Sequence, residues 1–318
     1  MTDFSSTEGS TVHLRQAVEL LTGRTPAVVD ARHFYDDAPV AAQLHGTTLT
    51  LQAPGTGRDL RPSVIVIYEI PPADRCRFTR FQALLGRSTT VSFGDQRSWR
   101  SATDKHEMVG KFTEAAIPQM DSVLLDNPGH TGAMDAFRRL GGDVWARPAV
   151  GFGGRDVFHL TSPQHLAAAT RHFSSIGGRW LLTQDARNID AQGRRHQYRV
   201  VVLGERILRV CEHVQHNPDA PCNEAQGAVS TVLPVDALPR HLLDLAVKAT
   251  RALGLPFGGV DLAAENGGVV FEVNVHPVLD VPHGYHTVTV PFVHAHLNRH
   301  PHYPTVGTGS LTTGNEEV

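Results

Sequence analysis

The segment from Gly258 to Asn274 carries three oxygen-bearing side chains at a spacing that suits a metal ion. It contains Asn266-Gly267, and Asn-Gly is a strong signal for the turn of a β-hairpin. With that turn, Asp261 lies opposite Glu272, and moving the turn by one residue places Asp261 opposite Asn274 instead. Because side chains alternate along a strand, both registers put Asp261, Glu272 and Asn274 on the same face.

The other face of this hairpin is apolar and is predicted to face a core; it holds Val260, Leu262, Phe271, Val273 and Val275. Two carboxylates that face each other repel unless a proton or a cation lies between them. Oxygen ligands favour Mg²⁺ or Mn²⁺, and Mg²⁺ commonly joins protein carboxylates to substrate phosphates. The hairpin therefore indicates a metal–phosphate site, with an ordinary half-exposed hairpin as the alternative.

The helices and strands that must position this face are predicted to form three lobes. Strands that alternate with helices predict an α/β lobe over residues 1–100. A second lobe with a glycine-rich loop is predicted over 101–178, and a third lobe with the metal hairpin over 179–303. The Gly/Thr-rich end at 304–318 is predicted to be disordered.

Within the first lobe, apolar spacing predicts a helix over 11–22 and another over 80–85. Runs of β-branched and apolar residues predict strands at 27–29, 63–68 and 89–93. The second lobe is expected to start with a helix capped by Asp104. A strand at 143–147, a loop at 151–154, a strand at 156–160 and a helix from Ser162 to Phe173 should follow.

The third lobe is predicted to open with the strand 180–184. A hairpin is expected next, with strands at 197–203 and 206–214 and Gly204-Glu205 as its turn. A helix is predicted over 236–253, ended by Gly254. The loop-like segment 212–230 is interpreted either as a mobile lid or as a plain connector.

Composition narrows the classes of function. The 318-residue chain has a formal net charge of −3, so no general positive field favours nucleic acid. No apolar run approaches the ~18 residues needed to cross a bilayer. Three cysteines without metal-type spacing fit reduced thiols, and we expect a cytoplasmic protein.

Four blocks, in this order, resemble the ATP-grasp enzymes, in the branch that contains glutathione synthetase and the ribosomal-protein glutamate ligases. Together they cover roughly residues 100 to 280. The blocks are Asp104-Lys105 with Ile117-Pro118; Arg147-Pro148 with the run from Gly151 to Val157; Leu182 to Asp185 with Tyr198 to Gly204; and Leu253-Gly254-Leu255 with Val260-Asp261 and Glu272 to Pro277.

The resemblance implies an α/β fold in which two α+β lobes grip ATP behind an amino-terminal α/β domain. It implies that Lys105 and Arg147 reach the phosphates of ATP. A loop with Gly151, Gly153 and Gly154 would lie over the phosphates, because glycine lets main-chain N–H groups approach them closely. The adenine and ribose pocket would be lined by Gln184, Asp185, Ala186 and Arg187. Two Mg²⁺ or Mn²⁺ ions would be held by Asp261, Glu272 and Asn274.

Four residues are implied on the substrate side. Arg199 would contact the γ-phosphate and the transferring group. Asn223, Arg209 and His276 are weaker candidates, and pairing across the Gly204-Glu205 turn puts Arg209 on the face opposite Arg199.

This chain departs from the family pattern at two positions. Arg147 stands where lysine is usual, which keeps the charge but replaces a point charge with a planar fork. The adenine-pocket acid is Asp185, where glutamate is more usual, so its reach is shorter. A surface arginine is the alternative interpretation of Arg147.

The predicted reaction is the ligation of a carboxylate to an amine through an acyl phosphate, with ADP and phosphate released. The cations Lys105, Arg147 and Arg199, with Mg²⁺, would offset the repulsion between an anionic acid and an anionic phosphate. Two alternatives stay open, a phosphotransferase on the same scaffold and an inactive Mg-ATP-binding module. The expected partners are an acid and an amine, each an amino acid or a peptide, and a homo-oligomer is left open.

Overall fold

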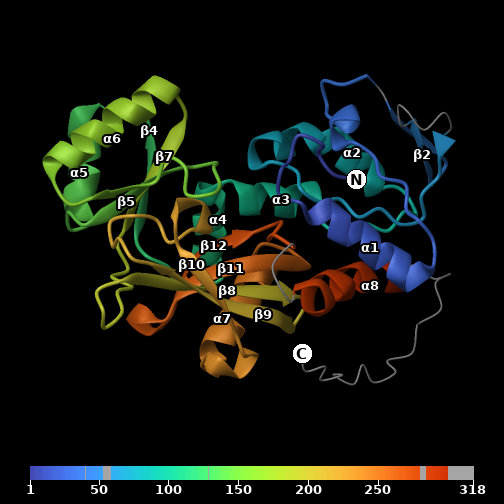
Figure 1. Ribbon diagram of the computed structural model, residues 1–318. Coiled ribbons are helices and arrows are strands. Elements are labelled where there is room, and N and C mark those ends of the chain that lie inside the picture. Colours follow the sequence, from blue (N-terminus) through green and yellow to red (C-terminus); the bar gives the residue numbers. More distant parts are fainter. Residues whose placement is uncertain (40, 53–58, 128, 280–283, 300–318) are drawn as a thin grey trace.

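The chain is described here from a computed structural model, which covers residues 1–39, 41–52, 59–127, 129–279 and 284–299. Three parts are visible in Figure 1: a small lobe with α5 and α6, an amino-terminal lobe with α1 and α2, and a central sheet that contains β8, β9, β11 and β12. The tail predicted to be disordered, 304–318, lies outside the described residues.

The amino-terminal lobe is built from extended segments and two helices, α1 (Ser10–Thr22) and α2 (Thr79–Leu85), both as predicted. The three strands predicted at 27–29, 63–68 and 89–93 are wrong as continuous strands. Only isolated parallel bridges occur there, which join Thr2 to Asp30 and Tyr68, and Val64 to Val91. Prolines at positions 26, 62 and 71 lack the N–H groups that longer ladders would need.

An antiparallel sheet in this lobe was not predicted. It consists of β1 (Ala42–His45), β2 (Thr48–Gln52) and β3 (Asp59–Leu60), in that order. Gly46 has a φ of 64° in the tight connection between β1 and β2, a conformation that glycine adopts without strain.

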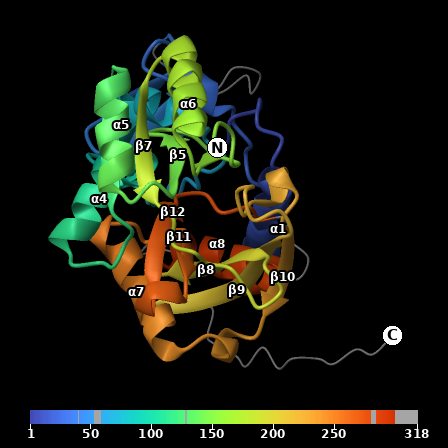
Figure 2. The ribbon, with the colours of Figure 1, turned by 90° about the vertical axis from the view of Figure 1, so that its left-hand side faces the viewer.

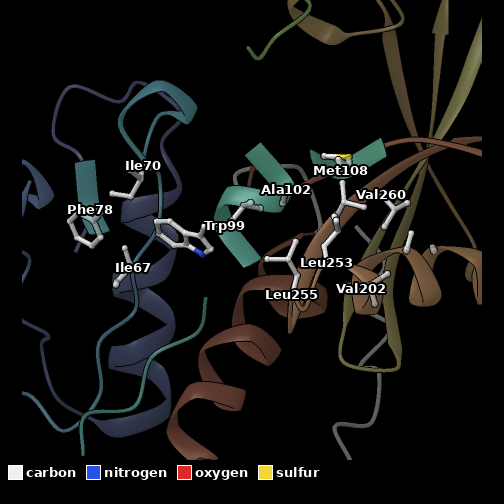
Figure 3. Packing of buried hydrophobic residues seen from close by; sticks show 14 of the residues in the cluster. Ile67, Ile70, Phe78, Trp99, Ala102, Met108, Val202, Leu253, Leu255 and Val260 are labelled. Carbon is white, nitrogen blue, oxygen red and sulfur yellow. The ribbon is translucent and has the colours of Figure 1, made fainter. Parts of the chain in front are cut away.

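Two helices connect the amino-terminal lobe to the rest, α3 (Gln96–Thr103) and α4 (Lys105–Glu114). As predicted, Asp104 caps α4, and its carboxylate accepts the backbone N–H groups of His106 and Glu107. Trp99 of α3 is buried at the middle of this region (Figure 3). On its two sides lie Ile67, Ile70 and Phe78 of the amino-terminal lobe, and Leu253 and Leu255 near the central sheet.

The small lobe is a four-stranded antiparallel sheet covered by α5 (His130–Arg139) and α6 (Pro163–Ile176) (Figure 2). Its strands are β4 (Ser122–Asp126), β5 (Val144–Pro148), β6 (Phe158–Leu160) and β7 (Arg179–Gln184), in the order β4-β7-β5-β6. The start of α6 agrees with the prediction, because the Ser162 hydroxyl accepts the His165 N–H and Pro163 follows it.

The strand β7 is the main correction to the predicted order of elements. We predicted that it opens the third lobe, whereas it lies inside the small-lobe sheet between β4 and β5. The reason is the apolar residues that it buries: Trp180 stacks on Phe173 of α6 with ring centroids 4.7 Å apart.

The large lobe is a five-stranded antiparallel sheet in the order β10-β9-β8-β11-β12. Its strands are β8 (Arg195–Leu203), β9 (Arg206–Gln215), β10 (Val229–Leu233), β11 (Phe257–Ala263) and β12 (Val269–Asn274). The predicted turn at Gly204-Glu205 is confirmed by the pairing of Leu203 with Arg206. The helix α7 (Arg240–Ala252) packs against the sheet and begins four residues later than predicted, directly after Pro239.

Short 3-10 turns complete these lobes at Ala31–Phe34, Pro72–Phe78, Glu224–Gln226, Val235–Ala237 and Glu265–Gly267. The last described helix is α8 (Val290–Asn298), preceded by a π-helical turn at Tyr285–Thr289, and it packs against α1.

The hydrophobic core divides at the small lobe. One cluster joins the amino-terminal lobe to the central sheet through residues such as Phe78, Trp99 and Val260. A second cluster lies wholly within residues 125–182, around Leu166, Phe173 and Trp180. The small lobe therefore has a core of its own. All three cysteines are free, and none of the helices in the described ranges is long and apolar enough to span a membrane.

Candidate active site

The hairpin formed by β11 and β12 carries the predicted oxygen-rich face. Asp261 pairs with Glu272 and Gly259 pairs with Asn274, which is the register expected from an Asn266-Gly267 turn. Both turn residues have positive φ, and the Gly268 N–H donates to the Glu265 carbonyl, as in a type I′ turn.

A β-bulge after Asp261 changes one side chain from the predicted arrangement. Leu262 pairs with Val270, so Phe271 is the extra residue. Phe271 was expected on the core face, but it lines the cavity beside Glu272 and packs near Ala186.

The three oxygen-bearing side chains on this face contact one another. The Asn274 amide donates to Asp261 Oδ2 at 3.1 Å and to Glu272 Oε1 at 3.4 Å. Burial raises the pKa of Asp261 although Arg199 and Asn274 oppose the rise, and the facing Glu272 charge adds to it. Two carboxylates that face each other in this way favour the binding of a cation between them.

Cations from two other elements approach Glu272. Lys105 Nζ lies 3.5 Å from Glu272 Oε2, and Arg147 Nη1 lies 3.9 Å from the same oxygen. Burial alone would raise the pKa of Glu272, but Lys105, Arg147 and Arg199 hold it below its ordinary value. The site therefore holds an ionised carboxylate between cations.

The small lobe positions both of these cations. Lys105 is the first residue of α4, its backbone N–H donates to the Ala149 carbonyl at 2.9 Å, and its ammonium donates to the Gly151 carbonyl at 3.2 Å. Arg147 lies on β5, and its Nε is buried without a hydrogen-bond partner. A buried guanidinium N–H without a partner is a donor suited to an anion.

The glycine-rich loop lies between β5 and β6, where the sequence predicted it. Gly153 and Gly154 have φ values of 66° and 69°, which other residues adopt only with strain. A Cβ on Gly154 would lie 2.8 Å from the Gln226 side chain, and the Gln226 amide donates to the Gly153 carbonyl at 3.1 Å. The loop thus meets the segment before β10 over the cavity.

One cavity collects most of the predicted nucleotide-binding residues. Its walls include Lys105, Arg147, Gly151, Gly153, Gly154, Gln184, Asp185, Ala186, Asp261 and Glu272. Arg187 is different, because its side chain is 80% exposed and lies 3.6 Å from Asp143. Sequence reasoning missed Trp145, Asn188, Arg195 and Gln197, which also line the cavity.

Asp185 is held from two sides. Its carboxylate accepts both Arg195 Nη1 at 2.7 Å and Arg195 Nη2 at 3.1 Å, and Trp145 Nε1 donates to it at 3.0 Å. Burial would raise the pKa of Asp185, but Arg195 holds it below its ordinary value. Both oxygens are therefore engaged by protein groups. The only sequence signal for this was the Arg194-Arg195 pair just before the predicted hairpin.

The predicted substrate-side residues do not form one group. Asn223 lines the nucleotide-side cavity, where its side chain also accepts the Ala225 N–H. His276 lies in a second cavity, and burial lowers its pKa well below the ordinary value. Arg209 was expected on the face opposite Arg199, but a bulge between Val201 and Val202 puts it on the same face.

The second cavity joins the oxygen-rich face to the amino-terminal lobe. It shares Lys105 and Glu272 with the first cavity, and adds Asn274 and His276 from the central sheet. The amino-terminal lobe contributes polar groups to it: Ser5, Ser6, Thr7, Glu8, Glu69 and Arg75. Glu272 and Lys105 thus stand between two cavities, a relation that no local sequence pattern indicated.

Comparisons with known proteins agree with this arrangement. A family profile described as "RimK-like ATP-grasp domain" matches residues 151–290. A "Probable alpha-L-glutamate ligase" of Pasteurella multocida is 34% identical over 84 residues, which are 26% of each chain. Its namesake in Haemophilus influenzae (strain Rd) is 23% identical over 196 residues, 60% of this chain and 61% of the relative. The chain thus matches less than two thirds of the length of either relative.

Similarity to solved structures extends further along the chain. The "ATP-grasp ligase PsnB complexed with minimal precursor" superimposes with a TM-score of 0.65 at 16% identity, over 94% of this chain and 96% of that one. At this identity the match bears on the fold. Residues 151–290 thus match a RimK-like ATP-grasp domain, and the chain has the ATP-grasp fold.

Proposed function

We propose that this protein is an ATP-dependent ligase that joins a carboxylate to an amine through an acyl phosphate and releases ADP and phosphate. One observation carries the proposal: Glu272 and Lys105 lie at the boundary of two cavities, one under the glycine-rich loop and one against the amino-terminal lobe. A nucleotide in the first cavity and an acid in the second would meet at these residues.

The oxygen-rich face fits a hard divalent cation. Asp261, Glu272 and Asn274 offer carboxylate and amide oxygens, the ligand set that Mg²⁺ and Mn²⁺ prefer. When bound there, such ions would neutralise phosphate charge and polarise the phosphoryl group. Asn274 would have to turn its amide oxygen toward a metal, because its nitrogen is the atom that now faces both carboxylates.

The phosphates of ATP fit the groups on the small-lobe side. Lys105 and Arg147 supply two buried cations, and the unpartnered Arg147 Nε supplies a further donor. Arginine in place of lysine offers a fork that can bind two phosphate oxygens, which argues for a working phosphate site. The main-chain N–H groups around Gly153 and Gly154 complete the enclosure.

Arg199 is the residue we assign to the reacting groups. Its strand position is directly opposite Asp261, so it can remain near the metal face while its guanidinium offsets charge on the acid being activated. Gln226 and the glycine-rich loop cover the first cavity, and we infer that this cover limits hydrolysis of the activated acid.

The substrates we favour are an amino acid or a peptide. The relatives are named as glutamate ligases, and the structural neighbour was solved with a precursor. The polar second cavity, which includes Glu8, Glu69 and Arg75, suits charged substrate groups better than an apolar ligand.

The test is a screen of acid and amine pairs with Mg-ATP, in which released phosphate and the nucleotide product are measured and the new compound is identified by mass. We expect ADP and phosphate only when both an acid and an amine are present. Formation of AMP would overturn the proposal. A stable phosphorylated product would identify a phosphotransferase, and Mg-ATP binding without turnover in any pair would identify an inactive nucleotide-binding module.

A further inference from the structure

Another cavity, the α2 cavity, lies between the amino-terminal lobe and the turn that follows β8. α2 and residues 90–95 line it on one side, and the Gly204-Glu205 turn and the end of α7 line it on the other. Its volume of about 600 Å³ is within the range of small-molecule sites. Among the described residues, it shares none with the two cavities of the proposed active site. Gly204 follows β8 and is five residues from Arg199, which corresponds to about 16 Å along a strand.

Gln82 of α2 brings a buried amide without a partner to this cavity. The residue is 6% exposed and lines the cavity. Its Nε2 and its Oε1 are both buried and make no hydrogen bond with the described part of the chain. Buried polar groups in folded proteins are almost always hydrogen-bonded, because an unmade hydrogen bond is costly. A ligand that supplies one donor and one acceptor would satisfy this amide.

Ser92 brings a second unpaired group to the same cavity. Its hydroxyl oxygen is buried, and none of the described residues forms a hydrogen bond with it. Thr90 lines the cavity as well, but its hydroxyl donates to the Pro62 carbonyl at 2.8 Å, which is the ordinary case. Gln82 and Ser92 lie on different elements, so the unpaired groups come from two separate parts of the lobe.

The charged residues at the cavity already have partners and lie toward solvent. Asp95 caps α3, where its carboxylate accepts two backbone N–H groups of that helix. Arg251 pairs with Glu205, and both side chains are mostly exposed. The exposed Arg299 lies over the Phe93 ring, 4.4 Å from its centroid. The groups left without partners are uncharged, which favours a neutral ligand over an ion.

Apolar side chains form much of the remaining wall. Leu85, Phe93 and Leu255 line the cavity and are buried. Hydrogen bonds are stronger in such surroundings than in water, because the local dielectric constant is low. An apolar wall with a few polar groups is the usual composition of a small-molecule site.

The geometry points to a binding site for a small neutral molecule with an amide edge, that is, a carbonyl acceptor beside an N–H donor. The N–H of such a molecule would donate to Gln82 Oε1, and its carbonyl would accept from Gln82 Nε2. Ser92 would supply a further hydrogen bond. A nucleobase such as uracil and a primary carboxamide such as nicotinamide both present this edge. Such a site is independent of the proposed ligase activity, because the cavity is separate from the reacting groups.

The experiment measures binding of uracil and of nicotinamide to the full chain by thermal unfolding over a range of probe concentrations. The matched probes are 1,3-dimethyluracil and N,N-dimethylnicotinamide, which keep the ring and the carbonyl and lack the N–H donor. We expect uracil, nicotinamide or both to stabilise the wild type, and the methylated probes to have little effect. The probe that binds identifies the ligand as a nucleobase or as a carboxamide.

Three variants locate the bound probe. In Gln82→Met the affinity should fall by about tenfold or more, the size expected for two lost neutral hydrogen bonds. Its melting temperature without ligand should equal or exceed that of the wild type, because an unpaired buried amide has been removed. Ser92→Ala should lose about fivefold in affinity. Gln96→Met is the control, because Gln96 is an exposed glutamine at the start of α3, and it should keep the full response.

The absence of any response to uracil and to nicotinamide in the wild type would overturn the inference and would leave water as the partner of Gln82. Equal responses in the wild type and Gln82→Met would overturn it too, since the probe would then bind elsewhere. A marked fall in the melting temperature of ligand-free Gln82→Met would show that the amide already has a partner in the folded chain. If Gln82→Met does not fold, Ser92→Ala decides, and an unchanged affinity in that variant contradicts the site.

Discussion

The guanidinium of Arg199 contacts both carboxylate oxygens of Asp261, with Nε to Oδ1 and Nη2 to Oδ2 each at 2.7 Å. The two residues are cross-strand partners on β8 and β11, so the sheet itself fixes their alignment. Burial would lower the pKa of Arg199, but the Asp261 charge raises it above its ordinary value. The carboxylate proposed to hold a metal is thus already compensated by the cation proposed to contact the reacting acid.

Replacing Arg199 with methionine should destabilise the fold by roughly 3 to 5 kcal/mol, because it leaves the Asp261 carboxylate buried without its partner. Arg199→Lys keeps the charge and loses the two-pronged contact, so a smaller loss is expected. Urea unfolding at pH 7 measures both. Equal losses in the two variants would show that the positive charge contributes nothing to stability without the two-pronged contact.

Replacing Glu272 with glutamine should abolish the extra stabilisation that Mg²⁺ gives to the ATP-bound protein. The variant keeps the shape of the side chain and removes the charge that faces Lys105 and Arg147. ATP without metal should bind at least as well as to the wild type, since both cations are released for phosphate. Thermal shifts with ATP, with and without Mg²⁺, report the difference.

Glu265→Gln is the matched control for this experiment, because Glu265 lies at the turn of the same hairpin and contacts His196 instead. Its Mg²⁺ response should equal that of the wild type. A full Mg²⁺ response in Glu272→Gln would contradict the proposed metal site.

Replacing Gly154 with alanine should raise the KM for ATP by about tenfold, equivalent to about 1.4 kcal/mol. Its φ of 69° strains an alanine, and the new methyl group would press on Gln226 at 2.8 Å. Gly141→Ala is the control, because Gly141 has a φ of 86° and a methyl group there would meet no neighbour within 4 Å. Steady-state kinetics measures the effect on KM for ATP, and urea unfolding measures the effect on stability. If both variants lose stability equally and neither changes KM, the glycine-rich loop has no role in binding.

Replacing Asp185 with asparagine should destabilise the protein at pH 7 by roughly 3 to 5 kcal/mol, because buried Arg195 loses its counter-charge. The folded-state pKa of Asp185 lies below its ordinary value of 3.8. Its stabilising contribution is therefore complete above that value and is lost as the pH falls through the folded-state pKa. The difference between wild type and variant should shrink below about pH 4. Denaturant unfolding at pH 7 and pH 3 measures this, and a constant difference would contradict the assignment.

The oxygen-rich face was predictable from the sequence for a clear reason. Asn266-Gly267 fixes a tight turn, and strand alternation then determines which residues face Asp261. The caps of α4 and α6 were predictable in the same local way, from Asp104 and from Ser162-Pro163.

What the sequence could not reveal depends on long-range pairing. The place of β7 between β4 and β5 is set by burial of Trp180 against a helix, and periodicity does not identify the partner strands of a buried strand. The bulges that redirected Phe271 and Arg209 add one residue to a strand without a distinct signature in its composition. The second cavity joins residues 5–8 to residues 272–276, and only the folded chain brings them together.

The separate core of the small lobe has a consequence for how this protein can evolve. Its apolar cluster shares no residue with the core that unites the amino-terminal lobe and the central sheet. Polar contacts join the small lobe to the rest of the molecule, such as those of Arg179 with Asp104 and of Gln226 with Gly153. Substitutions that repack the small lobe can therefore accumulate without repacking the other core, so the two cores are free to diversify at different rates.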